Sequence, residues 1–130
     1  MRALDILAVA IIALAIYRFA FPRSSAPFPA KPAPSIALAA MSGGTFSLAR
    51  LRGQVVFLDF WASWCEPCKQ SLPLVERFAA AHPEAIVVSV DAGEDPRIAR
   101  PYARAHAIRN VVFDPDMKAA DAFAVEGFPR

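Results

Sequence analysis

The sequence predicts an α/β fold in which a mostly parallel β-sheet is covered by helices on both faces. Two observations in residues 35–130 lead to this prediction. Short apolar runs rich in β-branched residues alternate along the chain with longer segments whose apolar residues recur at helical spacing. Strands that alternate with helices in this way typically pair in parallel, because each helix returns the chain to the edge where the previous strand began.

The first two strands are predicted in residues 35–48, where two short apolar runs flank Gly43-Gly44 and indicate a hairpin. Residues 54–62 form a nearly continuous apolar run of β-branched and aromatic residues, which is typical of a strand buried on both faces. Residues 68–83 carry apolar side chains at helical spacing, and we expect Pro83 to end that helix.

The same alternation continues to the end of the chain. Residues 85–91 read as a second buried strand, 95–107 as a helix, 110–114 as a third strand and 117–125 as a short helix. Together these segments give the strand–helix–strand order of an α/β domain.

Length, composition and charge limit what this domain can be. A chain of 130 residues that is 56% hydrophobic and 20% charged has room for one packed domain. The formal net charge is only +2, and no run of basic residues exceeds two. We therefore predict no nucleic-acid partner.

The N-terminus, residues 1–21, is dominated by the uncharged apolar stretch 6–17. A spanning helix needs about 20 residues, so an uncleaved membrane anchor requires that Arg18 reach the headgroups. A cleaved signal peptide ending near Ala26 is the alternative, although Pro27 is an unfavourable first residue of a mature chain. A buried soluble helix is a third interpretation, and the anchor is the one we favour.

A proline-rich linker follows, at residues 22–34, and contains five of the twelve prolines. Proline-rich segments favour the extended polyproline geometry and act as semi-rigid spacers. The folded domain is therefore predicted to span residues 35–130.

Both cysteines of the chain lie in the segment 61–68, "WASWCEPC", as Cys65 and Cys68. The predicted change from strand to helix places Cys65 at a helix N-terminus, where unpaired N–H groups and the helix dipole favour a thiolate. Pro67 suits the first turn of such a helix. Cys68 lies on the same face within disulfide reach, but so short a loop stabilises a fold little. The pair therefore suits a disulfide that opens and closes.

Metal and haem sites are poor explanations of the two cysteines. A zinc site needs two further ligands, and the two histidines, His82 and His106, lack the required spacing. Haem attachment needs a histidine at position 69, which is Lys. We predict no metal, no cofactor beyond the redox-active disulfide, and ordinary roles at helix ends for both histidines.

Asp59 interrupts the apolar strand 54–62 and is a second candidate catalytic residue. A buried carboxylate without a partner costs several kcal/mol, so the group should stay protonated more readily than usual. It could then take the Cys68 proton during disulfide exchange. The alternative is an exposed position at a strand edge, or a simple bond to a backbone N–H. We expect Trp61 in the core and Trp64 beside the sulfur pair.

The segment "VVFLDFWASWCEPCKQSLP" resembles the active-site strand, loop and helix of the thioredoxin superfamily. "GTFSLARLRGQVV" before it resembles the N-terminal hairpin of the TlpA/ResA group, whose members are anchored or exported and act on disulfides outside the cytoplasm. The resemblance covers about residue 35 to the last residue and implies a thioredoxin-like fold. It also implies that Cys65 is the attacking thiol and Cys68 the resolving one.

Further site residues follow from the same resemblance. "EGFP", residues 126–129, resembles the segment in which a proline, here Pro129, forms a cis peptide bond that faces the sulfurs. The resemblance assigns Pro129 to the catalytic residues with Cys65, Cys68 and Asp59. The substrate-binding residues are expected to be Trp64, Glu66, Pro67 and Phe128.

Glu66-Pro67 is the dipeptide of ResA-like members that keep apocytochrome c thiols reduced for haem attachment. Two positions depart from that pattern. Ser71 replaces a glutamate that ResA-like proteins usually carry, and Asp59 matches cytosolic thioredoxins where many TlpA-like sequences have asparagine. These departures weaken the inference about the substrate and leave the redox chemistry intact.

The resemblance implies a thiol–disulfide oxidoreductase, most simply a reductase, that a DsbD/CcdA-type membrane electron donor recharges. Its domain would face the periplasm from the bacterial inner membrane, or would be soluble there after signal cleavage. A reductant for copper-site or other envelope disulfides is an alternative function. A non-catalytic module that binds a metal or a partner through the thiols is another.

The end of the chain departs from the thioredoxin fold. After the proline matched by Pro129, that fold continues with two antiparallel strands and a closing helix, whereas only Arg130 follows here. We therefore expect an incomplete thioredoxin-like domain that lacks these elements. The strand 54–61 would then present an apolar edge.

Overall fold

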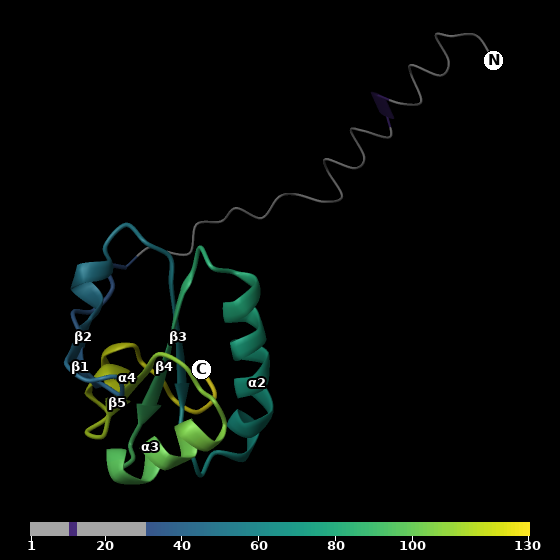
Figure 1. Ribbon diagram of the computed structural model, residues 1–130. Helices are drawn as coiled ribbons and strands as arrows, with labels where there is room; N and C mark the ends of the chain where they lie inside the picture. Colours follow the sequence, from purple (N-terminus) through teal and green to yellow (C-terminus); the bar gives the residue numbers. More distant parts are fainter. Residues whose placement is uncertain (1–10, 13–30) are drawn as a thin grey trace. The chain divides into compact units, whose positions relative to one another are not determined.

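The computed structural model describes residues 11–12 and 31–130 (Figure 1). All of the predicted anchor or signal segment except residues 11–12, and most of the predicted linker, lie outside the described residues. One compact unit, Ala33–Arg130, holds all the strands described. Within the described residues, no helix has the length and the apolar character needed to span a membrane.

The predicted hairpin is confirmed. Strand β1 (Ala37–Ala40) pairs antiparallel with β2 (Thr45–Ser47). Gly43 and Gly44 both have positive φ, at 100° and 76°, which glycine adopts without the strain that a Cβ would cause. A short 3-10 helix, η1 (Leu48–Leu51), follows the hairpin.

The hairpin joins a mixed sheet of five strands, in the order β2-β1-β5-β4-β3. Strands β3 (Val56–Trp61), β4 (Ile86–Ala92) and β5 (Val111–Asp114) run parallel, and β1 pairs antiparallel with β5. The predicted α/β class with a mostly parallel core is therefore confirmed. All residues of β5, and all of β4 after Ile86, are buried.

Three α-helices connect or follow these strands, namely α2 (Glu66–Ala81), α3 (Pro96–Ala105) and α4 (Lys118–Ala122). Figure 1 shows α2 running alongside β3 and β4. His82 forms the C-terminal cap of α2 and His106 that of α3, as predicted. Pro83 follows the cap of α2, where a helix cannot readily continue.

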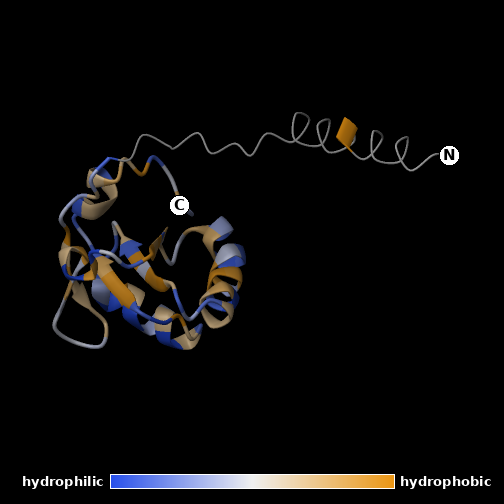
Figure 2. Cartoon of the chain, turned by 90° about the horizontal axis from the view of Figure 1, so that it is seen from above, coloured by the Kyte–Doolittle hydropathy of each residue, from blue (hydrophilic) through white to orange (hydrophobic). Residues whose placement is uncertain are grey.

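The core has two parts, one on each face of the sheet. Residues of α2 and α3 pack in the first cluster together with Trp61, both cysteines and Phe113. Residues of α4 pack in the second cluster with Phe60, Val90 and Val112. Orange predominates on the strands in the middle of the domain in Figure 2, which agrees with burial on both faces. Trp61 is fully buried, as predicted.

One expectation is wrong: β3 is not buried on both faces along its length. Only its last three residues, Asp59 to Trp61, are buried, whereas Val55 just before it and Phe57 within it are 69% and 44% exposed. Among the described residues, β3 is the last strand of the sheet, so its side chains lack the neighbours that a further strand would pack beside them on that side. The Phe60 N–H donates to the Arg130 carbonyl oxygen at 2.7 Å, and the Arg130 N–H donates to the Phe60 carbonyl oxygen at 3.2 Å.

Candidate active site

The two cysteines form a disulfide at the start of α2, with their Cα atoms 5.2 Å apart. Cys65 is the N-cap residue, and its Sγ accepts a hydrogen bond of 3.2 Å from the Cys68 N–H. Pro67 lies in the first turn of the helix. The predicted strand-to-helix position is confirmed, and the N–H groups and positive helix end favour negative charge on the Cys65 sulfur.

A groove beside the disulfide reaches Cys65 but not Cys68. This Cys65 groove has a volume of about 410 Å³. Cys68 is fully buried in the core. The residues that line the groove are Trp64, Cys65, Glu66, Pro67, Met117, Val125, Glu126, Gly127 and Phe128. A molecule in the groove therefore meets Cys65 first.

The four residues predicted to bind substrate all line this groove. Trp64 is 64% exposed, and its ring centroid lies 5.9 Å from that of Phe128. Glu66 is exposed and forms an ion pair of 2.7 Å with Lys69. The groove thus combines an exposed aromatic wall with polar groups at the start of α2.

The peptide bond between Phe128 and Pro129 is cis, as the resemblance implied. Phe128 packs against both core clusters, and with Gly127 it lines the Cys65 groove. Pro129 is exposed and follows these two residues at the end of the segment. Residues 125–128 therefore line the groove together with the start of α2, whereas Pro129 is not among its lining residues and its catalytic role stays a prediction.

Asp59 is buried in β3, with a side-chain oxygen, Oδ2, that has no hydrogen-bond partner. Burial raises its pKa to about 6, and the negative charge of Glu76 contributes further. Burial and easier protonation agree with the expectation from the sequence, and an exposed position is ruled out. The role of Asp59 as the group that accepts the Cys68 proton stays a prediction.

Glu76 of α2 was not singled out in the sequence. Its carboxylate accepts hydrogen bonds from the backbone N–H and Nε of Arg109, at 2.9 and 2.6 Å. Arg109 Nη2 also donates to the Glu76 carbonyl oxygen, at 3.2 Å. These contacts hold the carboxylate that influences Asp59 in one place.

A second buried acidic group, Asp91, was also missed. It is fully buried in β4, and burial raises its pKa to about 8, helped by a hydrogen bond with Glu94 and by the charges of Glu94 and Asp114. When Asp91 is ionised, neither of its carboxylate oxygens accepts a hydrogen bond. With a proton on it, Asp91 can donate to the neighbouring Glu94 carboxylate, which accounts for both observations.

Glu94 contacts the loop that carries Cys65. The backbone N–H of Ser63 donates to Glu94 Oε2 at 3.0 Å, and Ser63 Oγ donates to Oε1. The rule that singled out Asp59, an acid in an apolar strand, would also have found Asp91. The bond between Ser63 and Glu94 spans 31 positions and leaves no pattern in the sequence.

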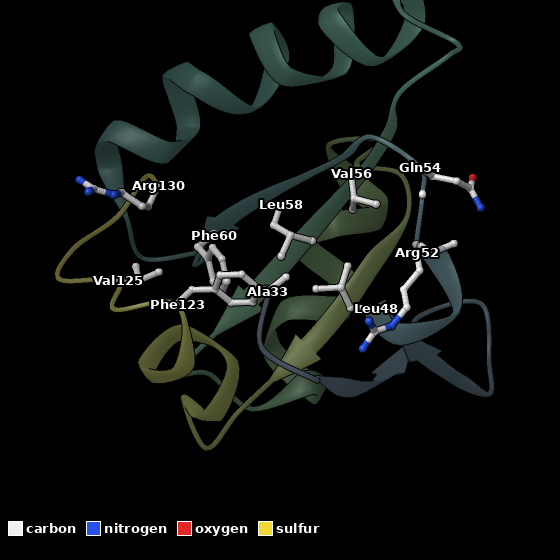
Figure 3. Close-up of a pocket in the computed structure, with 12 residues that line it drawn as sticks. Ala33, Leu48, Arg52, Gln54, Val56, Leu58, Phe60, Phe123, Val125 and Arg130 are labelled. Atoms are coloured by element: carbon white, nitrogen blue, oxygen red, sulfur yellow. The ribbon is translucent and has the colours of Figure 1, made fainter. Parts of the chain in front are cut away.

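Figure 3 shows a larger hollow, of about 530 Å³, which shares only Val125 with the Cys65 groove. Figure 3 shows Val56, Leu58 and Phe60 of β3 lining it together with Leu48 and Phe123. Neither a cysteine nor an aspartate or glutamate is among its lining residues. Among residues 11–12 and 31–130, no cluster of three or more metal-ligating side chains occurs. The disulfide and its groove are therefore the chemically competent site.

Comparison with known proteins agrees with this site. The AhpC/TSA family matches residues 29–129, which include both cysteines and Asp59. The chain belongs to the AhpC/TSA family. Its thioredoxin-like fold recurs in the exposed lipoprotein thioredoxin Etrx1 of Streptococcus pneumoniae, with a TM-score of 0.66 and 28% identity, covering 74% of this chain and 77% of that one.

A secreted disulfide oxidoreductase of Mycobacterium tuberculosis shares the fold at 24% identity, with a TM-score of 0.67 and coverage of 72% and 71%. Within the AhpC/TSA family, this chain is similar to the thiol-disulfide oxidoreductase ResA of Bacillus subtilis, at 32% identity over 102 residues. That match covers 75% of this chain and 56% of ResA. The chain therefore spans little more than half the length of this relative.

Proposed function

We propose that the protein is a thiol–disulfide oxidoreductase that acts through Cys65 and Cys68. The observation that carries this proposal is the asymmetry of the pair: Cys65, which is 4% exposed, caps a helix and lines a groove, whereas Cys68 is fully buried and lines no part of that groove. A relative named for this activity, ResA, supports it.

In the reduced protein, the Cys65 thiolate attacks a substrate disulfide in the groove. A mixed disulfide forms, and one substrate sulfur leaves as a thiolate. The Cys68 thiolate then attacks Cys65 Sγ, which releases the second substrate sulfur and forms the disulfide seen here. Two electrons pass to the substrate, whose two thiolates take up protons. The Cα separation of 5.2 Å lets the pair close without a large backbone movement.

Asp59 serves the second step of this exchange. Cys68 must lose its proton before it can attack, and it lies in the core away from solvent. The pKa of Asp59 is raised to about 6, so it lies closer to neutral pH than the pKa of an exposed carboxyl group, and Asp59 is a better proton acceptor. Asp59 therefore accepts the proton of Cys68 as the mixed disulfide resolves.

Turnover of insulin disulfides with dithiothreitol as the electron donor tests the activity. The full chain should accelerate insulin precipitation, and Cys65→Ser should not. Cys65→Ser is a matched control, because serine keeps the cap at the start of α2 and removes only the sulfur. A wild-type rate no higher than that of dithiothreitol alone would favour the non-catalytic module instead.

We infer that the protein works as a reductase outside the cytoplasm, held in the bacterial inner membrane by residues 1–21. Support comes from their apolar sequence and from two fold relatives described as an exposed lipoprotein and as secreted. A phosphatase reporter fused after Arg130 should be active in membrane-bound protein. Recovery of active, soluble protein cut near Ala26 would instead support a soluble periplasmic form.

The substrate we propose is apocytochrome c, with electrons supplied by a DsbD/CcdA-type donor. Glu66 and Pro67, which line the groove, are the residues that support this choice. Ser71 argues for a broader range of substrates, because ResA-like proteins usually carry a glutamate at this position. Its hydroxyl donates to the Cys68 carbonyl oxygen at 3.2 Å and cannot act as an acid. Reduction of copper-site or other envelope disulfides is therefore the second candidate. Partners trapped in cells by Cys68→Ser will distinguish the two.

A further inference from the structure

We propose that Asp91 and Glu94 are positioning residues that share one proton and hold the active-site loop through Ser63. The inference rests on the proposed function in one respect, that Cys65 is the reactive thiol. It adds a pair of acids that the exchange mechanism above does not use.

The pair lies directly beside the loop that carries Cys65. Asp91 is fully buried near the end of β4, where it pairs across the sheet with Trp61 of β3 and Phe113 of β5. The active-site loop begins right after Trp61, and Ser63 lies two residues before Cys65. A change at Asp91 and Glu94 therefore reaches Cys65 through a short, packed segment.

Glu94 holds the loop at two points. The backbone N–H and the hydroxyl of Ser63 both donate to the Glu94 carboxylate. Glu94 is itself buried, and the residue before it, Gly93, has φ of +73°. A Cβ on Gly93 would lie 3.0 Å from Met117 Sδ, so the chain is closely packed at this point. The carboxylate is thus fixed by its own backbone and can fix Ser63.

The proton follows from the chemistry of two adjacent buried acids. Two carboxylates in one buried site cannot both ionise cheaply, so one keeps its proton. Ser63 supplies two donors to Glu94, which stabilise Glu94 as the charged member. Asp91 has no donor of its own, so it holds the proton and donates it to Glu94.

The surrounding charges leave this proton in place. The neighbouring strands and α3 carry these other charged groups: Asp59 on β3, Asp114 on β5, Asp95 at the cap of α3, and Arg97, Arg100 and Arg104 within α3. Arg97 is paired with Asp95 at 2.6 Å. Arg100 lies over the Phe113 ring and donates to the Met41 carbonyl oxygen at 2.9 Å. Neither Arg97 nor Arg100 forms an ion pair with Asp91 or Glu94 among the residues that the structure describes.

Loss of the Asp91 proton changes the loop in two ways. The donor to Glu94 disappears, and a second negative charge appears next to the first. Repulsion then weakens the hold of Glu94 on Ser63, and the added charge disfavours the thiolate of Cys65. The rate at which Cys65 reacts should therefore rise with pH as its thiol ionises. At higher pH, where Asp91 also ionises, the rate should lie below the titration curve expected if the Cys65 thiol alone ionised.

The test follows alkylation of Cys65 by iodoacetamide from about pH 5 to about pH 10, in the reduced full chain with Cys68→Ser so that one thiol remains. The parent should show a second inflection near pH 8, where the raised pKa of Asp91 lies, with rates about threefold below the single-ionisation curve. Asp91→Asn should remove this inflection, because asparagine keeps a donor for Glu94 and cannot ionise.

Two further variants keep the test decisive. Glu94→Gln removes the neighbouring charge that raises the Asp91 pKa, so the inflection should move to lower pH. Asp95→Asn is the matched control, since it removes an exposed carboxylate one residue further on and should leave the inflection in place. An identical profile in the parent and Asp91→Asn, or an unmoved inflection in Glu94→Gln, would overturn the proposal. Absence of insulin turnover by the wild type would instead overturn the proposed function, because alkylation requires no substrate disulfide.

Discussion

Replacing Asp59 by Asn should stabilise the protein at neutral pH, and the gain should disappear in acid. The pKa of Asp59 rises from its ordinary value of 3.8 to about 6, mainly through burial. A raised pKa means that the folded state binds the proton more tightly than the unfolded state, so wild-type stability falls as pH rises through this interval. The shift is 6 − 3.8, about two units, which at about 1.4 kcal/mol per unit gives about 3 kcal/mol.

Guanidinium chloride unfolding of the oxidised full chain measures this effect. The difference in free energy of unfolding between Asp59→Asn and wild type should grow by about 2.4 kcal/mol from about pH 4 to about pH 7, because a small part of the full effect is already present at pH 4, and should change little above that. Asp116→Asn removes an exposed carboxylate and is the matched control, with a difference that stays within about 0.5 kcal/mol. If the difference in free energy of unfolding between Asp59→Asn and wild type does not vary with pH, burial does not raise the pKa of Asp59 and the reasoning is wrong.

The remaining predictions concern kinetics, the groove and the backbone. Asp59→Asn should slow release of the mixed disulfide more than its formation in stopped-flow traces, and equal slowing of both steps would count against its service to Cys68. Trp64→Ala should lower kcat/KM for insulin about tenfold, because it removes the exposed ring beside Phe128, while the free energy of unfolding changes by less than about 0.5 kcal/mol. Gly93→Ala should lower the melting temperature, at a cost of about 1–3 kcal/mol, since alanine is strained at φ of +73° and its Cβ would crowd Met117; an unchanged melting temperature would show that the turn can relax.

The sequence was most informative where chemistry is local. Cys65 could be placed at a helix start from the residues next to it, and the buried Asp59 from its apolar neighbours. The hairpin at Gly43 and Gly44 followed from its turn residues in the same way.

What failed depends on contacts between distant segments. The apolar run 54–62 predicted burial on both faces, whereas the exposure of Phe57 depends on which segments pack against the start of β3, and the pattern of one strand does not contain this information. The contact of Ser63 with Glu94 joins two loops that only the folded sheet brings together. The effect of Glu76 on Asp59 likewise requires α2 to lie over β3.

The measurement that tests the central claim most directly is the capture of mixed disulfides by single-cysteine variants of the full chain. Reduced Cys68→Ser, offered a disulfide-containing protein such as insulin, should accumulate a covalent complex through Cys65 that mass spectrometry locates and dithiothreitol removes. Cys65→Ser should accumulate far less, because the remaining sulfur is fully buried and lies outside the groove. A complex formed more readily through Cys68 would contradict the assignment of Cys65 as the attacking thiol.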